Sequence, residues 1–185
     1  IGLIEQPCLL LRSKEKQSTN FTAASHHLSW ASKLAVMASL ESAGHQVSLV
    51  DLRSGAEEVA LGEVEWNNVT LQKIARGRNW ERALNPYAHD VWGITSNHYQ
   101  EREIPLSIIR FLAHYRAVVI VGGTDAISDP QTYIKAGARV VVRLRGRQGS
   151  GGGGVAPPRR IAPDTPAESS VARLALTTLC AVFPL

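Results

Sequence analysis

The chain contains few of the residues and runs that mark several classes of protein. Only two of its 185 residues are cysteines, Cys8 and Cys180, which is too few for a disulfide framework or a zinc site. No apolar run reaches the roughly 18 residues of a membrane-spanning helix, and the first residues lack the charged and apolar regions of a secretory signal peptide. We therefore expect a cytoplasmic protein with no membrane partner.

Most of the chain also lacks an excess of positive charge. Residues 1–138 carry 13 basic and 14 acidic residues, a net charge of −1, whereas residues 139–185 carry 7 basic and 2 acidic residues, a net charge of +5. That basic segment holds a single aromatic residue, Phe183. Nucleic-acid surfaces normally combine basic and aromatic side chains on folded structure. We therefore expect no nucleic-acid partner.

The most informative stretch is an apolar run at 118–121 that ends in Gly122 and Gly123. An unbroken β-branched run is typical of a strand buried on both faces of a parallel sheet. Such sheets bind ligands at the carboxyl ends of their strands. Because glycine has no Cβ, the backbone there can turn sharply and a ligand can approach closely, and we expect a larger side chain at Gly122 to strain the backbone. The same glycines also suit an ordinary turn from strand to helix.

Strand and helix patterns alternate along the first three quarters of the chain. This alternation predicts an α/β fold with a doubly wound, flavodoxin-like, five-stranded parallel sheet in strand order 2-1-3-4-5. Residues 12–27 are expected to form a long loop, 59–64 to be helix or strand, and 68–75 to be weakly helical. The expected strands are 2–7, 47–52, 90–97, 118–121 and 138–142, and the expected helices are 30–43, 104–115 and 131–136.

The composition changes after residue 142. Residues 143–185 are rich in Gly, Pro and Arg and contain no Lys, which predicts an irregular, low-complexity tail. Residues 169–182 are a candidate amphipathic helix within it. Arg, Gly, Ala and Pro are encoded by GC-rich codons, so we interpret this tail as a segment that a shifted reading frame could produce. The first domain is therefore expected to cover residues 1–142.

Small polar residues follow three of the expected strands, and the predicted sheet brings these strand ends to one edge. The chain has no Gly-x4-Gly-Lys-Ser/Thr motif and no Gly-x-Gly-x2-Gly motif after a strand, which argues against a triphosphate ligand. We predict a slot for a large, mostly neutral cofactor. Its expected binding residues are Gln6, Pro7, Thr95, Ser96, Asn97, His98, Gly122, Gly123, Thr124 and Asp125.

Several of these segments look like one family in the same order. They are Ile-Gly-Leu-Ile-Glu-Gln-Pro, Ala-Gly-His-Gln-Val, Asp-Val-Trp-Gly-Ile-Thr-Ser, Val-Gly-Gly-Thr-Asp-Ala and Asp-Pro-Gln-Thr-Tyr-Ile-Lys-Ala-Gly-Ala-Arg-Val-Val-Val. Over residues 1–142 the chain resembles the cobalamin-binding domain at the front of cobalamin-dependent radical SAM enzymes. The resemblance implies a Rossmann-like domain that binds cobalamin and supports methyl transfer or related radical chemistry.

The chain departs from cobalamin proteins in three ways, the first of which is general in the radical SAM branch. The chain lacks the Asp-x-His-x2-Gly motif through which other cobalamin domains supply a histidine to cobalt, and Arg-Leu-Arg-Gly-Arg-Gln-Gly replaces a Gly-Glu-Gly-Glu end. It also lacks the Cys-x3-Cys-x2-Cys triad that holds an iron–sulfur cluster. The resemblance therefore implies that S-adenosylmethionine and a 4Fe-4S cluster bind a separate radical SAM domain or subunit, and that this chain is not catalytic alone. His98, at a strand's carboxyl end, is the one candidate for a cobalt ligand.

Two other interpretations of the sequence stay open. The first is a flavodoxin-like domain that binds a nucleotide or a flavin, because the same sheet order and strand ends serve such ligands. The second is an inactive, truncated fragment of a larger enzyme.

Overall fold

The computed structural model of the chain describes residues 1–14, 20–22 and 29–142. Five strands form a sheet in which every neighbouring pair is parallel, in the order β4-β1-β7-β8-β9. The α/β fold with a five-stranded parallel sheet is therefore confirmed. The strands are β1 (Gly2–Glu5), β4 (Ser48–Asp51), β7 (Val91–Thr95), β8 (Val118–Gly122) and β9 (Val140–Val141).

When all the strands that the structure describes are numbered in chain order, this sheet runs 4-1-7-8-9 and differs from the expected 2-1-3-4-5. The numbers differ because strands of a second sheet precede both β4 and β7 in the chain. The five segments that we expected to form the parallel sheet do form it. Within the sheet, β1 lies between β4 and β7. In this sheet the chain passes from β1 to β4 on one side and from β7 to β8 on the other, which makes the β1/β7 pair the switch point where ligands of such sheets bind.

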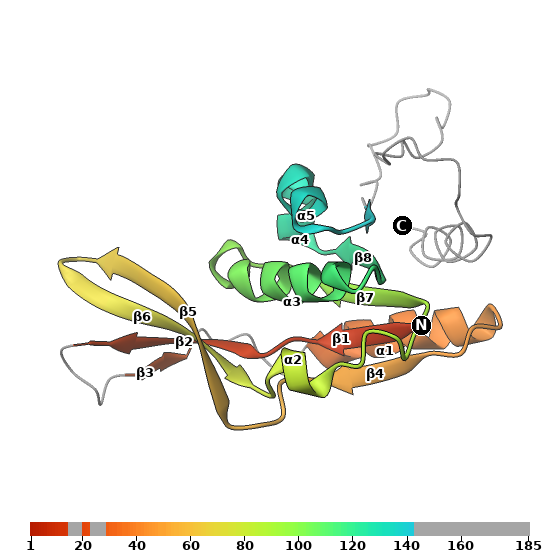
Figure 1. The fold of residues 1–185 in the computed structure, drawn as a ribbon, viewed down its shortest axis with the longest axis horizontal. Helices are drawn as coiled ribbons and strands as arrows, with labels where there is room; N and C mark the ends of the chain where they lie inside the picture. The colour runs from red at the N-terminus through yellow and green to blue at the C-terminus, as the bar shows by residue number, and fades with distance from the viewer. Residues whose placement is uncertain (15–19, 23–28, 143–185) are drawn as a thin grey trace.

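The second sheet was not predicted. It contains four antiparallel strands in the order β3-β2-β6-β5, and β2 follows β1 almost directly. Figure 1 shows this sheet extending away from the carboxyl ends of the parallel strands. Its strands are β2 (Cys8–Ser13), β3 (Asn20–Thr22), β5 (Glu57–Trp66) and β6 (Val69–Gly77).

Two sequence-based expectations fail in this second sheet. The expected loop at 12–27 contains part of β2 and all of β3, and the weakly helical stretch at 68–75 lies mostly in β6. The second error concerns the strand that begins directly after the turn between β5 and β6, a turn that contains no glycine. Trp66 pairs with Val69, so Asn67 and Asn68 alone form the turn, with φ angles of 46° and 62°. Asparagine tolerates this left-handed geometry, which two-residue hairpin turns require.

The helices agree more closely with the sequence. The three expected helices correspond to α1 (Ser29–Ser42), α3 (Glu103–His114) and α5 (Pro130–Ala136). Asp129 caps α5 by accepting from the Thr132 amide, and Gly137 ends it with a φ of 112°. The shorter elements are α2 (Trp80–Ala83), η1 (Tyr99–Glu101) and α4 (Thr124–Ser128). Within the described ranges, no helix has the length and apolarity needed to cross a bilayer.

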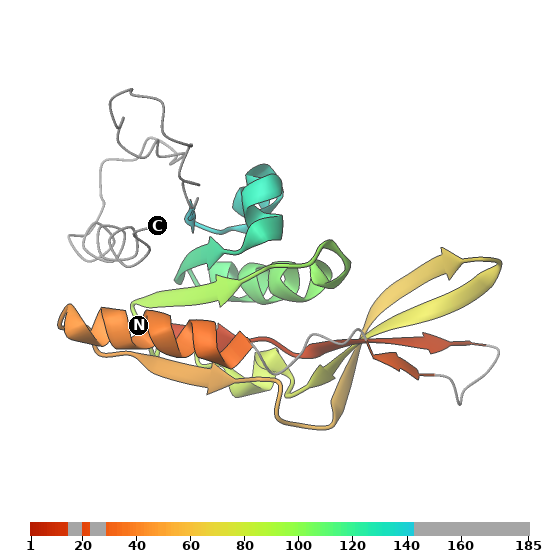
Figure 2. The same cartoon turned by 180° about the vertical axis from the view of Figure 1, so that it is seen from behind.

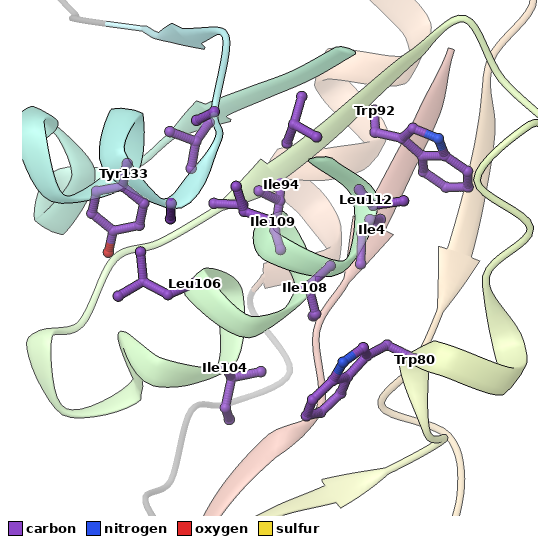
Figure 3. Packing of buried hydrophobic residues seen from close by; sticks show 14 of the residues in the cluster. Ile4, Trp80, Trp92, Ile94, Ile104, Leu106, Ile108, Ile109, Leu112 and Tyr133 are labelled. Carbon is purple, nitrogen blue, oxygen red and sulfur yellow. The ribbon is translucent and has the colours of Figure 1, made fainter. Parts of the chain in front are cut away.

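The main hydrophobic core lies between the parallel sheet and α3. Ile104, Ile108 and Leu112 are fully buried along one side of that helix, as the helical spacing predicts. They belong to the same cluster as Ile4 and Trp92 of the sheet (Figure 3). Viewed from behind, α1 covers the opposite face at β1 (Figure 2). The candidate helix at 169–182 and the tail 143–185 lie outside the described residues.

Candidate functional site at the carboxyl edge of the parallel sheet

Buried polar side chains gather at one edge of the parallel sheet. Glu5 ends β1 and Gln6 follows it, Ser96 follows β7, and Asp125 follows β8. Burying such groups costs stability unless each is hydrogen-bonded, so their concentration at one place commonly marks a functional site. We call this region the carboxyl edge. Of the buried polar side chains that the structure describes, only Ser13 lies away from it; the others are Glu5, Gln6, Lys33, Ser96, Glu101 and Asp125.

The loops after β7 and β8 are bonded to each other. The Ser96 amide donates to the Gly122 carbonyl at 2.8 Å, and the Asp125 amide donates to the Ser96 carbonyl at 3.1 Å. The Thr124 hydroxyl donates to the Asn97 carbonyl at 2.6 Å, and its amide donates to Asn97 Oδ1 at 3.3 Å. The structure therefore brings these predicted residues together, but it closes the gap between the two strand ends.

The two glycines after β8 have different roles. Gly123 has a φ of 103°, and a Cβ there would lie 2.2 Å from the Ser96 carbonyl oxygen. Gly122 is not among the glycines with positive φ, and a Cβ there would meet no atom within 4 Å. The expectation that Gly122 needs a glycine-only conformation was therefore wrong, and that constraint belongs to Gly123. Gly122 instead borders open space at the carboxyl edge.

Ser96 and Asp125 take part in a buried network. Ser96 Oγ lies 2.7 Å from the Tyr133 hydroxyl, which in turn donates to Asp125. Arg102 binds both oxygens of Asp125, at 2.8 Å and 2.7 Å, and also binds Asp129 at 2.9 Å. The Arg102 guanidinium holds the pKa of Asp125 below its usual range, although burial opposes this shift. Burial, followed by the bond to Asp125, raises the pKa of Tyr133.

This network changes the predicted roles of two residues. The side chains of Ser96 and Asp125 are buried and bind other side chains of the protein, so they stabilise the loops instead of contacting a ligand. Arg102 and Tyr133 were not among the predicted site residues, because no local pattern links residues 23 positions apart. Arg102 also lies over the ring of the exposed Tyr99, with its guanidinium carbon 4.7 Å from the ring centroid.

The outer surface of the edge is formed by the residues after β7. Asn97, His98 and Tyr99 are exposed, whereas Thr95 is half-buried. His98 precedes η1 and makes no side-chain capping bond to it. In the part of the chain that the structure describes, no three His, Cys, Asp or Glu side chains lie close enough together to hold a metal ion. His98 could therefore supply only a single ligand to a metal held by another group.

The end of β1 carries charges that are paired within the protein. Glu5 is fully buried, and Oε2 lies 2.5 Å from Lys33 Nζ of α1. Arg53 Nε lies 3.6 Å from the other oxygen of Glu5. Two cations thus compensate one buried carboxylate, which holds α1 against β1 at the switch point. The next two residues, Gln6 and Pro7, are buried.

Cys8 follows this strand end and offers a chemical probe of it. Burial raises the pKa of the Cys8 thiol; Arg53 opposes the shift, and the Glu101 and Glu5 carboxylates add to it. We expect iodoacetamide to modify Cys8 more slowly at pH 7 than it modifies a free thiol, because only the thiolate reacts. Because the pKa of Cys8 is raised, the rate should continue to rise at pH values above about 8.5, the pKa of an unperturbed thiol. Mass spectrometry of the peptides separates Cys8 from Cys180, and a free-thiol rate at Cys8 would contradict the expectation.

An open groove lies away from the carboxyl edge. It has a volume of about 850 Å³ and lies between β5, α2 and α3. None of the predicted site residues lines it. Its apolar lining includes Leu61, Trp80, Leu106, Phe111 and Tyr115. It therefore serves as the alternative location in the binding experiments below.

Comparisons with protein-family models, with curated proteins and with solved structures found no match to this chain.

Proposed function

We propose that residues 1–142 bind cobalamin at the carboxyl edge, as the cofactor domain of a cobalamin-dependent radical SAM system. The observation that carries the proposal is the gathering of buried polar side chains at the carboxyl ends of β1, β7 and β8, with open space at Gly122, the last residue of β8. The resemblance of the strand-end segments to cobalamin domains supports this choice of ligand. Cobalamin is also large and mostly uncharged, and no phosphate-binding motif is present.

The residues available to hold the cofactor are those on the outer surface of the edge. Asn97 and His98 can donate or accept hydrogen bonds there, and Gly122 allows close approach because it lacks a side chain. Ser96, Asp125 and Gly123 fix the shape of the loops that present them. Bound cobalamin supplies cobalt-centred methyl-transfer chemistry. The proposed partner is a radical SAM domain or subunit that holds S-adenosylmethionine and a 4Fe-4S cluster.

A flavin or nucleotide is less well supported as the ligand. Phosphate groups are commonly held where a short loop joins a strand to a helix N-terminus. Here β1 leads into β2 of the second sheet, and α1 begins only at Ser29. The direct connection from strand to helix is therefore absent after β1 in the described residues. Titration with FMN tests this alternative, and saturable quenching of flavin fluorescence would favour it over cobalamin.

Substitution at Gly122 tests the proposed site. We expect the parent protein to give a saturable change in the absorbance of hydroxocobalamin. Gly122→Val should weaken this binding at least tenfold, or about 1.4 kcal/mol, because the new side chain occupies the open space. Ala60→Val adds bulk to β5 in the lining of the alternative groove, and it should bind like the parent if the ligand sits at the carboxyl edge. Circular dichroism checks that both variants are folded, and equal binding by a folded Gly122→Val protein would place the ligand elsewhere.

His98→Ala tests the candidate cobalt ligand separately. If His98 binds cobalt, the complex of the parent protein should have the absorbance spectrum of an imidazole-ligated cobalamin, and the variant should lose it. If the two spectra are the same, His98 does not bind cobalt. This result would not affect the proposed binding site itself, because Gly122→Val tests the site independently.

A further inference from the structure

Gln6 and Glu101 form an incomplete hydrogen-bonded pair at the switch point. Gln6 follows β1, Glu101 lies in η1 after β7, and their exposed fractions are 9% and 5%. Gln6 Nε2 donates to Glu101 Oε2 at 3.5 Å, which is long for such a bond. Gln6 Oε1 is buried and has no partner. The pair therefore has more acceptors than donors.

The nearby cations do not supply the missing donors. Lys33 and Arg53 both face the Glu5 carboxylate, which is buried in the same region. Arg102, the residue after Glu101, binds Asp125 and Asp129. A buried acceptor without a donor is unfavourable, and most buried polar atoms in folded proteins have at least one hydrogen-bond partner. Among the described residues no donor bonds to Gln6 Oε1, so an N–H or O–H donor of a bound ligand can complete the pair.

We propose that Gln6 and Glu101 form a subsite that recognises N–H donors of the ligand bound at the carboxyl edge. This inference rests on the proposed function: for cobalamin, the donors are primary amides at the rim of the corrin ring. A carboxylate can only accept hydrogen bonds when ionised, so Glu101 binds an amide N–H and repels a carboxylate at the same position. Glu101 thus determines which groups the site admits, and Gln6 Oε1 accepts from the same donor.

Cobalamin monocarboxylates, in each of which one rim amide has been hydrolysed, test this subsite. We expect the parent protein to bind at least one of them tenfold or more weakly than hydroxocobalamin. Glu101→Gln should reduce that difference to threefold or less, because an amide at this position donates to the carboxylate and removes the repulsion. The inference is overturned if the parent binds all of these ligands equally, or if Glu101→Gln leaves the discrimination unchanged.

The stability of the free protein provides a test that needs no ligand. Glu101→Gln places an amide beside Gln6, and this amide can accept from Gln6 Nε2 and donate to Gln6 Oε1. We therefore expect its thermal midpoint to equal or exceed that of the parent. Glu5→Gln is the matched control, and it should lower the midpoint because Glu5 has cationic partners. A lower midpoint for Glu101→Gln would show a structural role and overturn the inference.

The ligand titrations and the thermal midpoints together distinguish failure of the subsite from failure of the proposed function. If the parent does not bind hydroxocobalamin at all, the proposed function fails. The thermal midpoint of Glu101→Gln then decides the subsite, because that measurement does not depend on the ligand. If the parent binds but does not distinguish the monocarboxylates, the proposed function stands and the subsite is wrong.

Discussion

Gly123→Ala is expected to cause one of the largest losses of stability of any single substitution at the carboxyl edge. Residues other than glycine are strained at a φ of 103°, and the new Cβ would lie 2.2 Å from the Ser96 carbonyl oxygen. Strain of this kind costs about 1–3 kcal/mol, and overpacking adds a similar amount. We therefore expect the free energy of unfolding, measured in urea, to fall by about 3 kcal/mol or more.

Gly122→Ala is the matched control for this prediction. Its Cβ would meet no atom within 4 Å, and its φ is not positive, so the free energy of unfolding should change by less than about 1 kcal/mol. Equal losses for the two variants would show that the turn after β8 does not depend on Gly123. Unequal losses in the expected direction would assign the backbone constraint to Gly123.

Arg102→Met is expected to have the second large effect. The substitution removes both hydrogen bonds to Asp125, whose side chain is only 6% exposed. Removing one partner of a buried ion pair leaves an uncompensated charge, which costs about 3–5 kcal/mol when both groups are fully buried. Because the Arg102 side chain is 18% exposed, we expect a loss of about 3 kcal/mol at pH 7. Arg110→Met, on the exposed side of α3, should cost less than about 0.5 kcal/mol.

The loss in Arg102→Met should depend on pH. Arg102 lowers the pKa of Asp125 in the folded protein below its value of about 3.9 in the unfolded chain. The stabilisation that this shift provides is therefore present above about pH 4 and disappears as the pH falls through the lowered pKa. The difference in unfolding free energy between parent and variant should shrink over that range. A difference that stays constant from pH 7 to pH 3 would contradict a charge-based role for Arg102.

The parallel sheet could be predicted from the sequence because its strands are short apolar runs between turn residues. The run at 118–121 has no polar residue, as expected when both faces of a strand are covered, and it forms all of β8 except the final Gly122. The Asp129-Pro130 pair predicted the start of α5, and Gly137 predicted its end. These signals are local in the chain, so single segments were sufficient to identify them.

The second sheet and the network could not be predicted in the same way. Strand β5 is mostly exposed and contains four glutamates, and its turn into β6 uses Asn-Asn without glycine. Its strand pairing depends on contacts with β6 that a single segment does not reveal. The bonds of Arg102 to Asp125, and of Gln6 to Glu101, join residues 23 and 95 positions apart. The sequence therefore identified the residues near the edge but not which of them are bonded to one another.

Chemical-shift mapping with hydroxocobalamin would test most directly whether the carboxyl edge is the binding site. Cobalt(III) in this cofactor is diamagnetic, so the amide signals of a uniformly 15N-labelled chain stay visible during a titration. We expect saturable shifts at residues 96–99 and 122–124, with smaller changes along the groove between β5 and α3. Shifts confined to that groove, or no shifts at any concentration, would contradict the assignment of cobalamin to the carboxyl edge.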